Sequence, residues 1–200
     1  MLDGSELDAS LSGRQQKPVI ISLVGRHNAG KTTVGEDLVA GWTQMGFSVA
    51  VLKHEGMHGD GFEGERKGPP DWEKQGSDTT RYAAKGARYT VVAGGGESLW
   101  RVTQEPDGDN PDIMVKKVQD FIEISGEFVD IILVEGYKGS ALPKVVVLRD
   151  EADVAWIQSF RPRNVIAAVC PTDFACLAAI PWRVYHDSYI RQLCADLMHQ

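Results

Sequence analysis

Apolar, β-branched runs alternate along the chain with segments whose apolar residues recur every three to four positions. Residues 18–24 and 47–53 predict two strands, and residues 31–45 between them predict a helix that ends before Gly46. One apolar face of this helix is formed by Val34, Leu38, Val39, Trp42 and Met45. Strands that alternate with amphipathic helices are typical of a parallel α/β sheet.

The rest of the pattern extends this alternation and adds one hairpin. The further predicted elements are a short helix at 77–87 capped by Ser77 or Asp78, a hairpin at 88–103, a helix at 111–125, and strands at 129–136, 143–150 and 164–173. The segment 54–76 is rich in glycine, proline and charge. It has too few apolar residues to order itself, so we expect a mobile loop that a bound nucleotide or a partner protein orders.

The segment between the first strand and the first helix carries a phosphate-binding pattern. Gly25, four residues, and then Gly30-Lys31-Thr32 have the spacing of a P-loop, and the strand before it and the helix after it are the context that the motif requires. Glycines let successive N–H groups converge on phosphate oxygens at a helix N-terminus. The predicted nucleotide-binding residues of this loop are Gly25, Arg26, His27, Asn28, Ala29, Gly30, Lys31, Thr32 and Thr33.

Two of these residues have a specific predicted role. We expect Lys31 to be exposed at the start of the helix and to reach the terminal phosphates. The hydroxyl of Thr32 is a hard oxygen ligand suited to Mg²⁺. The loop therefore predicts a nucleoside triphosphate bound with magnesium.

Glu135 is the candidate catalytic and second metal-binding residue. It ends the most apolar strand in the chain, so its carboxylate should lie at the carboxyl edge of the sheet, where open α/β sheets bind ligands. There it would meet the magnesium through water, or polarise an attacking water. The alternative is a solvated glutamate at a strand end.

Further polar residues follow other strands at the same edge. Lys53, His54 and His58, with Asp78 at the start of the next helix, could bind a phosphate or a second anionic ligand. Metal binding by the two histidines and a simply solvated loop are the alternatives, because helical spacing means nothing in a glycine-rich loop. Asp173 follows the last predicted strand and would accept hydrogen bonds from a guanine ring or cap a helix.

Composition limits the cellular context and the number of domains. The 200 residues are 42% apolar, which favours one nucleotide-binding domain over residues 18–200 after a disordered tail at 1–17. A net charge of −7 disfavours nucleic acid and anionic membranes as partners. Three cysteines without a CxxC pair favour buried thiols in the cytoplasm. No apolar run is long enough for a signal peptide or a membrane helix.

Several motifs together resemble the MobB family of molybdenum cofactor biosynthesis. The motifs are GRHNAGKTT, LKHEGMH, GSDTTRYAAKGA, VEGYK and KVVVLRD, in this order over residues 18–150. The resemblance implies a P-loop NTPase-type three-layer sandwich with a mostly parallel sheet and a hairpin insertion. It further implies a homodimeric GTP-binding adaptor with weak GTP hydrolysis that works beside a MobA-type guanylyltransferase, with molybdopterin as a further ligand.

Two other functions use the same loop. A small-metabolite kinase would need a lid over its substrate, and residues 54–76 are placed to form one. A metallochaperone-type GTPase would use His54 and His58 to carry a metal, although no cysteine lies near them. The residues of the loop are compatible with both GTP and ATP.

Overall fold

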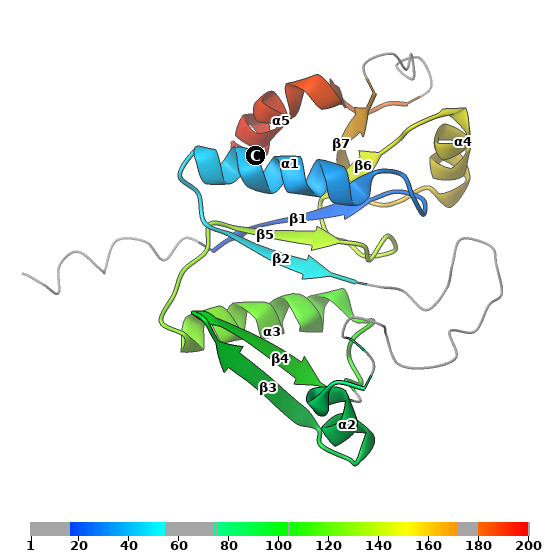
Figure 1. The fold of residues 1–200 in the computed structure, drawn as a ribbon. Coiled ribbons are helices and arrows are strands. Elements are labelled where there is room, and N and C mark those ends of the chain that lie inside the picture. The colour runs from blue at the N-terminus through cyan, green and yellow to red at the C-terminus, as the bar shows by residue number, and fades with distance from the viewer. Residues whose placement is uncertain (1–16, 55–73, 75, 104, 172–179, 200) are drawn as a thin grey trace, which may run out of the picture. The chain divides into compact units, whose positions relative to one another are not determined.

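The computed structural model describes residues 17–54, 74, 76–103, 105–171 and 180–199, which belong to two compact units (Figure 1). The first unit lies within residues 1–55 and 115–200, and the second within residues 56–114. The predicted loop at 54–76 therefore lies almost wholly outside the described residues, and so does the predicted tail. The prediction of one domain over residues 18–200 stays a prediction.

The first unit is built on a parallel sheet in the order β2-β5-β1-β6-β7-β8. Its strands are β1 (Val19–Val24), β2 (Val49–Lys53), β5 (Ile131–Glu135), β6 (Lys144–Val147), β7 (Val165–Cys170) and β8 (Val184–His186). Because β1 lies between β5 and β6, the chain leaves it toward β2 on one side and reaches β7 and β8 on the other. Ligands bind at the carboxyl ends of strands at such a switch of direction.

Both faces of this sheet are buried, which explains the nearly continuous apolar runs of its strands. Side chains alternate between the faces: Leu23, Val145 and Val169 belong to one core cluster, and Val24, Val146 and Cys170 to the other. Burial on both faces also holds the polar Ser22 fully out of solvent. Its hydroxyl donates to the carbonyl of Gly136 at 2.9 Å, so this buried polar group has a hydrogen-bond partner.

Helices cover the two faces. α1 (Lys31–Gln44) and α5 (Ile190–Leu197) pack together on the face that carries Leu23, where they contribute Leu38, Trp42 and Leu193 to the core. α4 (Glu151–Phe160) contributes Val154 and Ile157 to the core of the opposite face. The result is the predicted three-layer α/β fold.

The second unit contains α2 (Asp78–Ala84) and an antiparallel hairpin of β3 (Tyr89–Gly94) and β4 (Glu97–Val102). Of the two predicted caps of α2, Ser77 is the one that forms, since its hydroxyl accepts from the N–H of Thr80 at 3.3 Å. α3 (Pro111–Ile124) begins in this unit and continues into the first.

The predicted elements all form, with end points shifted by a few residues. Met45 differs from the prediction, because it lies just beyond α1 with 46% of its surface exposed and does not join the apolar face. Among the described residues after 150, the elements that were not predicted are α4, β8 and α5, the last preceded by a short 3₁₀ turn η2 (Asp187–Tyr189).

Candidate functional site

The loop between β1 and α1 has the backbone of a phosphate cradle. Gly30 ends it in the left-handed conformation with φ +85°, and Asn28 before it has φ +59°. At Gly25 a Cβ would lie 2.8 Å from the carbonyl oxygen of Val147, so only glycine lets the loop pass this close to β6. No side chain caps α1, whose first N–H groups therefore face the loop that Gly30 closes.

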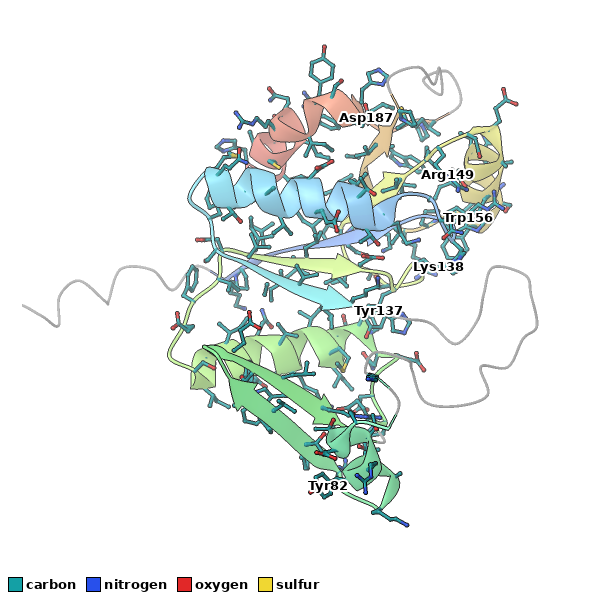
Figure 2. All side chains as sticks on the ribbon, viewed as in Figure 1. Tyr82, Tyr137, Lys138, Arg149, Trp156 and Asp187 are labelled. Atoms are coloured by element: carbon teal, nitrogen blue, oxygen red, sulfur yellow. The ribbon has the colours of Figure 1, made fainter. Side chains whose placement is uncertain are left out.

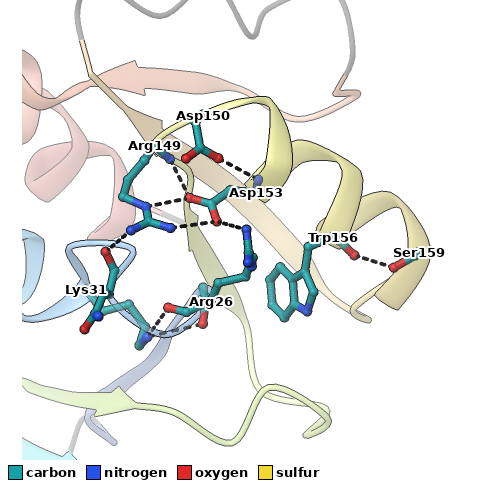
Figure 3. Close-up of polar contacts among 9 residues, drawn as sticks. Arg26, Lys31, Arg149, Asp150, Asp153, Trp156 and Ser159 are labelled. Carbon is teal, nitrogen blue, oxygen red and sulfur yellow. Dashed lines mark hydrogen bonds and ion pairs between the residues drawn. The ribbon is translucent and has the colours of Figure 1, made fainter. Parts of the chain in front are cut away.

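Lys31 reaches back across this loop. Its Nζ donates to the carbonyl oxygens of Arg26 at 2.7 Å and Gly25 at 3.2 Å (Figure 3). The side chain is half-buried and its charge is engaged by the loop, so the prediction of an exposed lysine was wrong. Two carbonyl oxygens of the loop thus hold the ammonium close to the start of α1.

Thr32 and Glu135 come together at the carboxyl edge of the sheet. The Thr32 hydroxyl lies 3.4 Å and 3.5 Å from the two carboxylate oxygens of Glu135, although the residues are 103 positions apart. Lys53 ends the adjacent strand, and its Nζ is 3.7 Å from Glu135 Oε1. Because Lys53 is more than half exposed, this ion pair is weak. The hydroxyl and the carboxylate are hard oxygen donors of the kind that Mg²⁺ prefers.

His54 lies beside this pair and stacks on Tyr137. The ring centroids are 3.9 Å apart with an interplanar angle of 20°, and Tyr137 is almost fully buried. The His54 N–H continues the sheet by donating to the carbonyl of Glu135 at 2.8 Å. Figure 2 shows Tyr137 and Lys138 at the end of the sheet to which the strand arrows point. His54 is therefore packed against the site rather than extended into solvent.

A buried carboxylate supports the loop from α4. Asp153, whose side chain is 0% exposed, accepts from the Arg149 N–H at 2.9 Å and Nε at 3.0 Å, and from Arg26 at 3.4 Å (Figure 3). Arg149 also donates to the carbonyl of Asn28. Burial raises the pKa of the Asp153 carboxyl, but the hydrogen bonds and charge of Arg149, together with the charge of Arg26, outweigh it and hold the pKa below its ordinary value.

The structure places most of the predicted site residues in the first unit. Lys53, His54 and Glu135 lie in one row at the carboxyl edge, because their strands are neighbours in register. Of the nine residues of the predicted loop, residues 25–30 join β1 to α1 and residues 31–33 begin α1, with His27 and Thr33 exposed and Ala29 buried. Asp78 belongs to the second unit, where it pairs with Arg81 at 3.3 Å. His58 and Asp173 lie outside the described residues.

Sequence reasoning missed three residues around the loop. Arg149 and Asp153 bind the loop from outside it, and Tyr137 stacks on His54. A signal for the first two was present, because Asp150 and Asp153 at the start of an apolar segment have the spacing of a helix N-terminus. Nothing in the sequence indicated that this helix would face the loop.

The described residues contain neither a cluster of metal-binding side chains nor a membrane-spanning helix. Within the part of the chain that the structure describes, no three His, Cys, Asp or Glu residues gather as metal ligands. None of the described helices is both long and apolar enough to cross a bilayer.

Comparison with known families identifies a match over most of the chain. Residues 20–171 match the family described as MobB, molybdopterin guanine dinucleotide synthesis protein B. A probable molybdopterin-guanine dinucleotide biosynthesis adapter protein of Bacillus subtilis is 33% identical over 75% of this chain and 75% of its own. The molybdopterin-guanine dinucleotide biosynthesis adapter protein of Escherichia coli is 27% identical over 78% of this chain and 80% of its own.

Solved structures show the same fold. The crystal structure of Bacillus subtilis MobB superposes with a TM-score of 0.66 at 26% identity, over 89% of this chain and 96% of that one. A MobB homologue from Bacillus stearothermophilus superposes with a TM-score of 0.59 at 24% identity, over 91% of this chain and 99% of that one.

Proposed function

Because the chain belongs to the MobB family of molybdopterin guanine dinucleotide synthesis proteins, we propose that it is a GTP-binding adaptor that assists formation of this dinucleotide. The names of its relatives support the adaptor role, and the glycine-bounded loop at 25–33 supports nucleotide binding. In this proposal a MobA-type guanylyltransferase performs the transfer in the cytoplasm, and the chain supplies GTP beside it, with molybdopterin as a further ligand.

The observation that carries the proposal is the position of Lys31 over a glycine-bounded loop. Its ammonium is held by two carbonyl oxygens at the N-terminus of a helix of 14 residues, so the lysine and the helix dipole favour an anion at the same place. A phosphate group would accept from Lys31 and from the N–H groups of the loop. The chain would bind a triphosphate at this point even without any contact to the base.

The donor set at the end of β5 fits Mg²⁺, which prefers a few protein oxygens and keeps several waters. Thr32 and Glu135 would hold the ion, Thr32 directly and Glu135 directly or through water. When bound, the ion supplies positive charge that offsets the charge of the phosphates. Glu135 would orient a water for the weak hydrolysis of GTP.

Calorimetry with purified protein tests whether the chain binds GTP and prefers it to ATP. We expect GTP to bind in the presence of Mg²⁺ and more tightly than ATP, and Lys31→Ala to weaken GTP binding at least 10-fold without changing the circular dichroism spectrum. The matched control is Lys116→Ala, which removes an exposed lysine paired with Asp120 on α3. Equal GTP affinity in wild type and Lys31→Ala would refute the phosphate site. Tighter binding of ATP than GTP would contradict the guanine preference.

The hairpin of the second unit supports the proposed homodimer. Leu99 and Trp100 point to opposite faces of β4, and both are more than half exposed, as is Tyr89 on β3. A two-stranded sheet is marginal alone and needs a further layer or strand. If β4 pairs with β4 of a second copy antiparallel about Leu99, Glu97 faces Arg101 in both directions, so the strand complements itself in charge.

The oligomeric state tests this pairing. We expect wild type to sediment as a dimer and Leu99→Lys to sediment as a monomer. The control is Ile124→Lys, which places the same charge on an 85% exposed side chain of α3. A dimer that survives Leu99→Lys would exclude the centre of β4 from the interface.

A further inference from the structure

We propose that Asp153 is the positioning residue of the phosphate loop, acting through Arg26 and Arg149 to hold Lys31 and the tip of the loop in place. The inference rests on the proposed phosphate site and deepens it by naming the groups that shape it. All of the residues lie in the first unit (Figure 3).

Asp153 is held in place by contacts that do not involve the loop. It lies in the first turn of α4, where its N–H donates to the carboxylate of the N-cap residue Asp150 at 2.9 Å. Its carboxylate has no exposure to solvent, and both of its oxygens accept hydrogen bonds from arginines. A buried carboxylate held in this way cannot change rotamer without leaving an unpaired charge. It is therefore a fixed point next to the loop.

The first connection runs through Arg26. The side chain of Arg26 reaches Asp153 at 3.4 Å, while its carbonyl oxygen accepts from Lys31 Nζ at 2.7 Å and from the N–H of Ala29 at 3.2 Å. One residue thus joins the buried carboxylate to the lysine that would contact the phosphates. If Arg26 lost its anchor, its carbonyl would no longer hold the ammonium over the loop.

The second connection runs through Arg149. Its N–H, Nε and one terminal nitrogen all donate to Asp153, and its other terminal nitrogen donates to the carbonyl of Asn28. Asn28 is in the left-handed region at the tip of the loop. The guanidinium therefore engages the carbonyl oxygen of Asn28, which would repel a phosphate if it pointed into the loop.

The two connections together give Asp153 a role in preorganisation. With the carboxylate present, the loop is held at Arg26 and at Asn28, so binding a phosphate costs little further ordering. The carboxylate also offsets one of the two arginine charges, and the cluster keeps a net charge of +1 from its three side chains, which suits an anion.

Nucleotide affinity and loop exchange test the inference together. We expect Asp153→Asn to weaken GTP binding about 10-fold and Arg149→Met to weaken it by less, because Arg26 still joins Asp153 to the loop in the second variant. The double variant should bind GTP no more weakly than Asp153→Asn alone, because Arg149 acts with Asp153 along one of the two connections. In nucleotide-free protein, hydrogen exchange of the amides at 26–31 should speed up in both variants while exchange in β5 stays unchanged. A merely structural role would speed exchange throughout the first unit. The control is Glu151→Gln, which removes an exposed negative charge from the first turn of α4 and leaves the hydrogen bonds of Asp153 in place.

The outcomes separate this inference from the proposed function. Wild-type affinity and unchanged loop exchange in Asp153→Asn would overturn the inference, even if Lys31→Ala abolishes binding. Absence of GTP binding by wild type would overturn the phosphate site, while faster loop exchange in Asp153→Asn would still support positioning. If Asp153→Asn does not fold, Arg149→Met decides the question, because Asp153 then keeps Arg26 as its partner.

Discussion

Among the described glycines, Gly136 combines a left-handed φ with a steric clash for an added Cβ. It follows Glu135 with φ +112°, and a Cβ there would lie 2.9 Å from the carbonyl oxygen of His54. Neither group can move away: the Gly136 N–H donates to Leu23, its carbonyl accepts from Ser22, and the His54 N–H donates to Glu135. For Gly136→Ala we therefore expect about 1–3 kcal/mol of backbone strain and about 1–3 kcal/mol of steric cost.

Urea unfolding followed by circular dichroism measures this change, with Gly139→Ala as the matched control three residues further on. At Gly139 a Cβ meets no atom within 4 Å and φ is not in the left-handed region, so the expected change is within about 1 kcal/mol. Comparing the two variants removes the shared effect of glycine on the unfolded chain. If Gly136→Ala unfolds at the same urea concentration as Gly139→Ala, the reasoning from the fixed backbone is wrong.

Three further predictions concern single side chains. Glu135→Gln should lower GTP hydrolysis at least ~10-fold, with a smaller change in the affinity measured by calorimetry; unchanged hydrolysis would leave Glu135 a solvated strand end. Because the pKa of Asp153 is lowered in the folded protein, its contribution to stability is present above the ordinary value of 3.8 and is lost as pH falls below it, so acid unfolding of Asp153→Asn should depend less on pH than that of wild type. The Nζ of the buried Lys144 donates to the carbonyls of Ser140 and Leu142, and Lys144→Met leaves both without this donor, so it should lower the free energy of unfolding by about 1–3 kcal/mol; an unchanged urea midpoint would contradict this.

The loop could be predicted from the sequence because its chemistry is local. Gly25, Gly30, Lys31 and Thr32 fall within eight consecutive positions, and the strand and helix on either side are read from neighbouring residues. Glu135 was also found, since the end of an apolar strand fixes which edge of the sheet a residue occupies. Its distance from Thr32 follows once the two strands are adjacent.

The support of the loop could not be predicted in the same way. Arg26 and Asp153 are 127 positions apart, and no local pattern says that α4 begins beside β1. α5 was missed because it has only eight residues, too few for a clear helical period. Its core residues, such as Leu193, are explained only by the α1 surface on which they pack.

The packing of α5 on α1 has a consequence for synthesis on the ribosome. The Trp42 Nε1–H donates to the carbonyl of Cys194 at 3.2 Å, across 152 positions, and Trp42 is fully buried once α5 is in place. At about 5–20 residues per second, those positions take roughly 8–30 s to translate. For that time the nascent chain carries α1 with a tryptophan that α5 does not yet cover. Chaperones that recognise exposed aromatic side chains should therefore bind this segment of the nascent chain before α5 emerges.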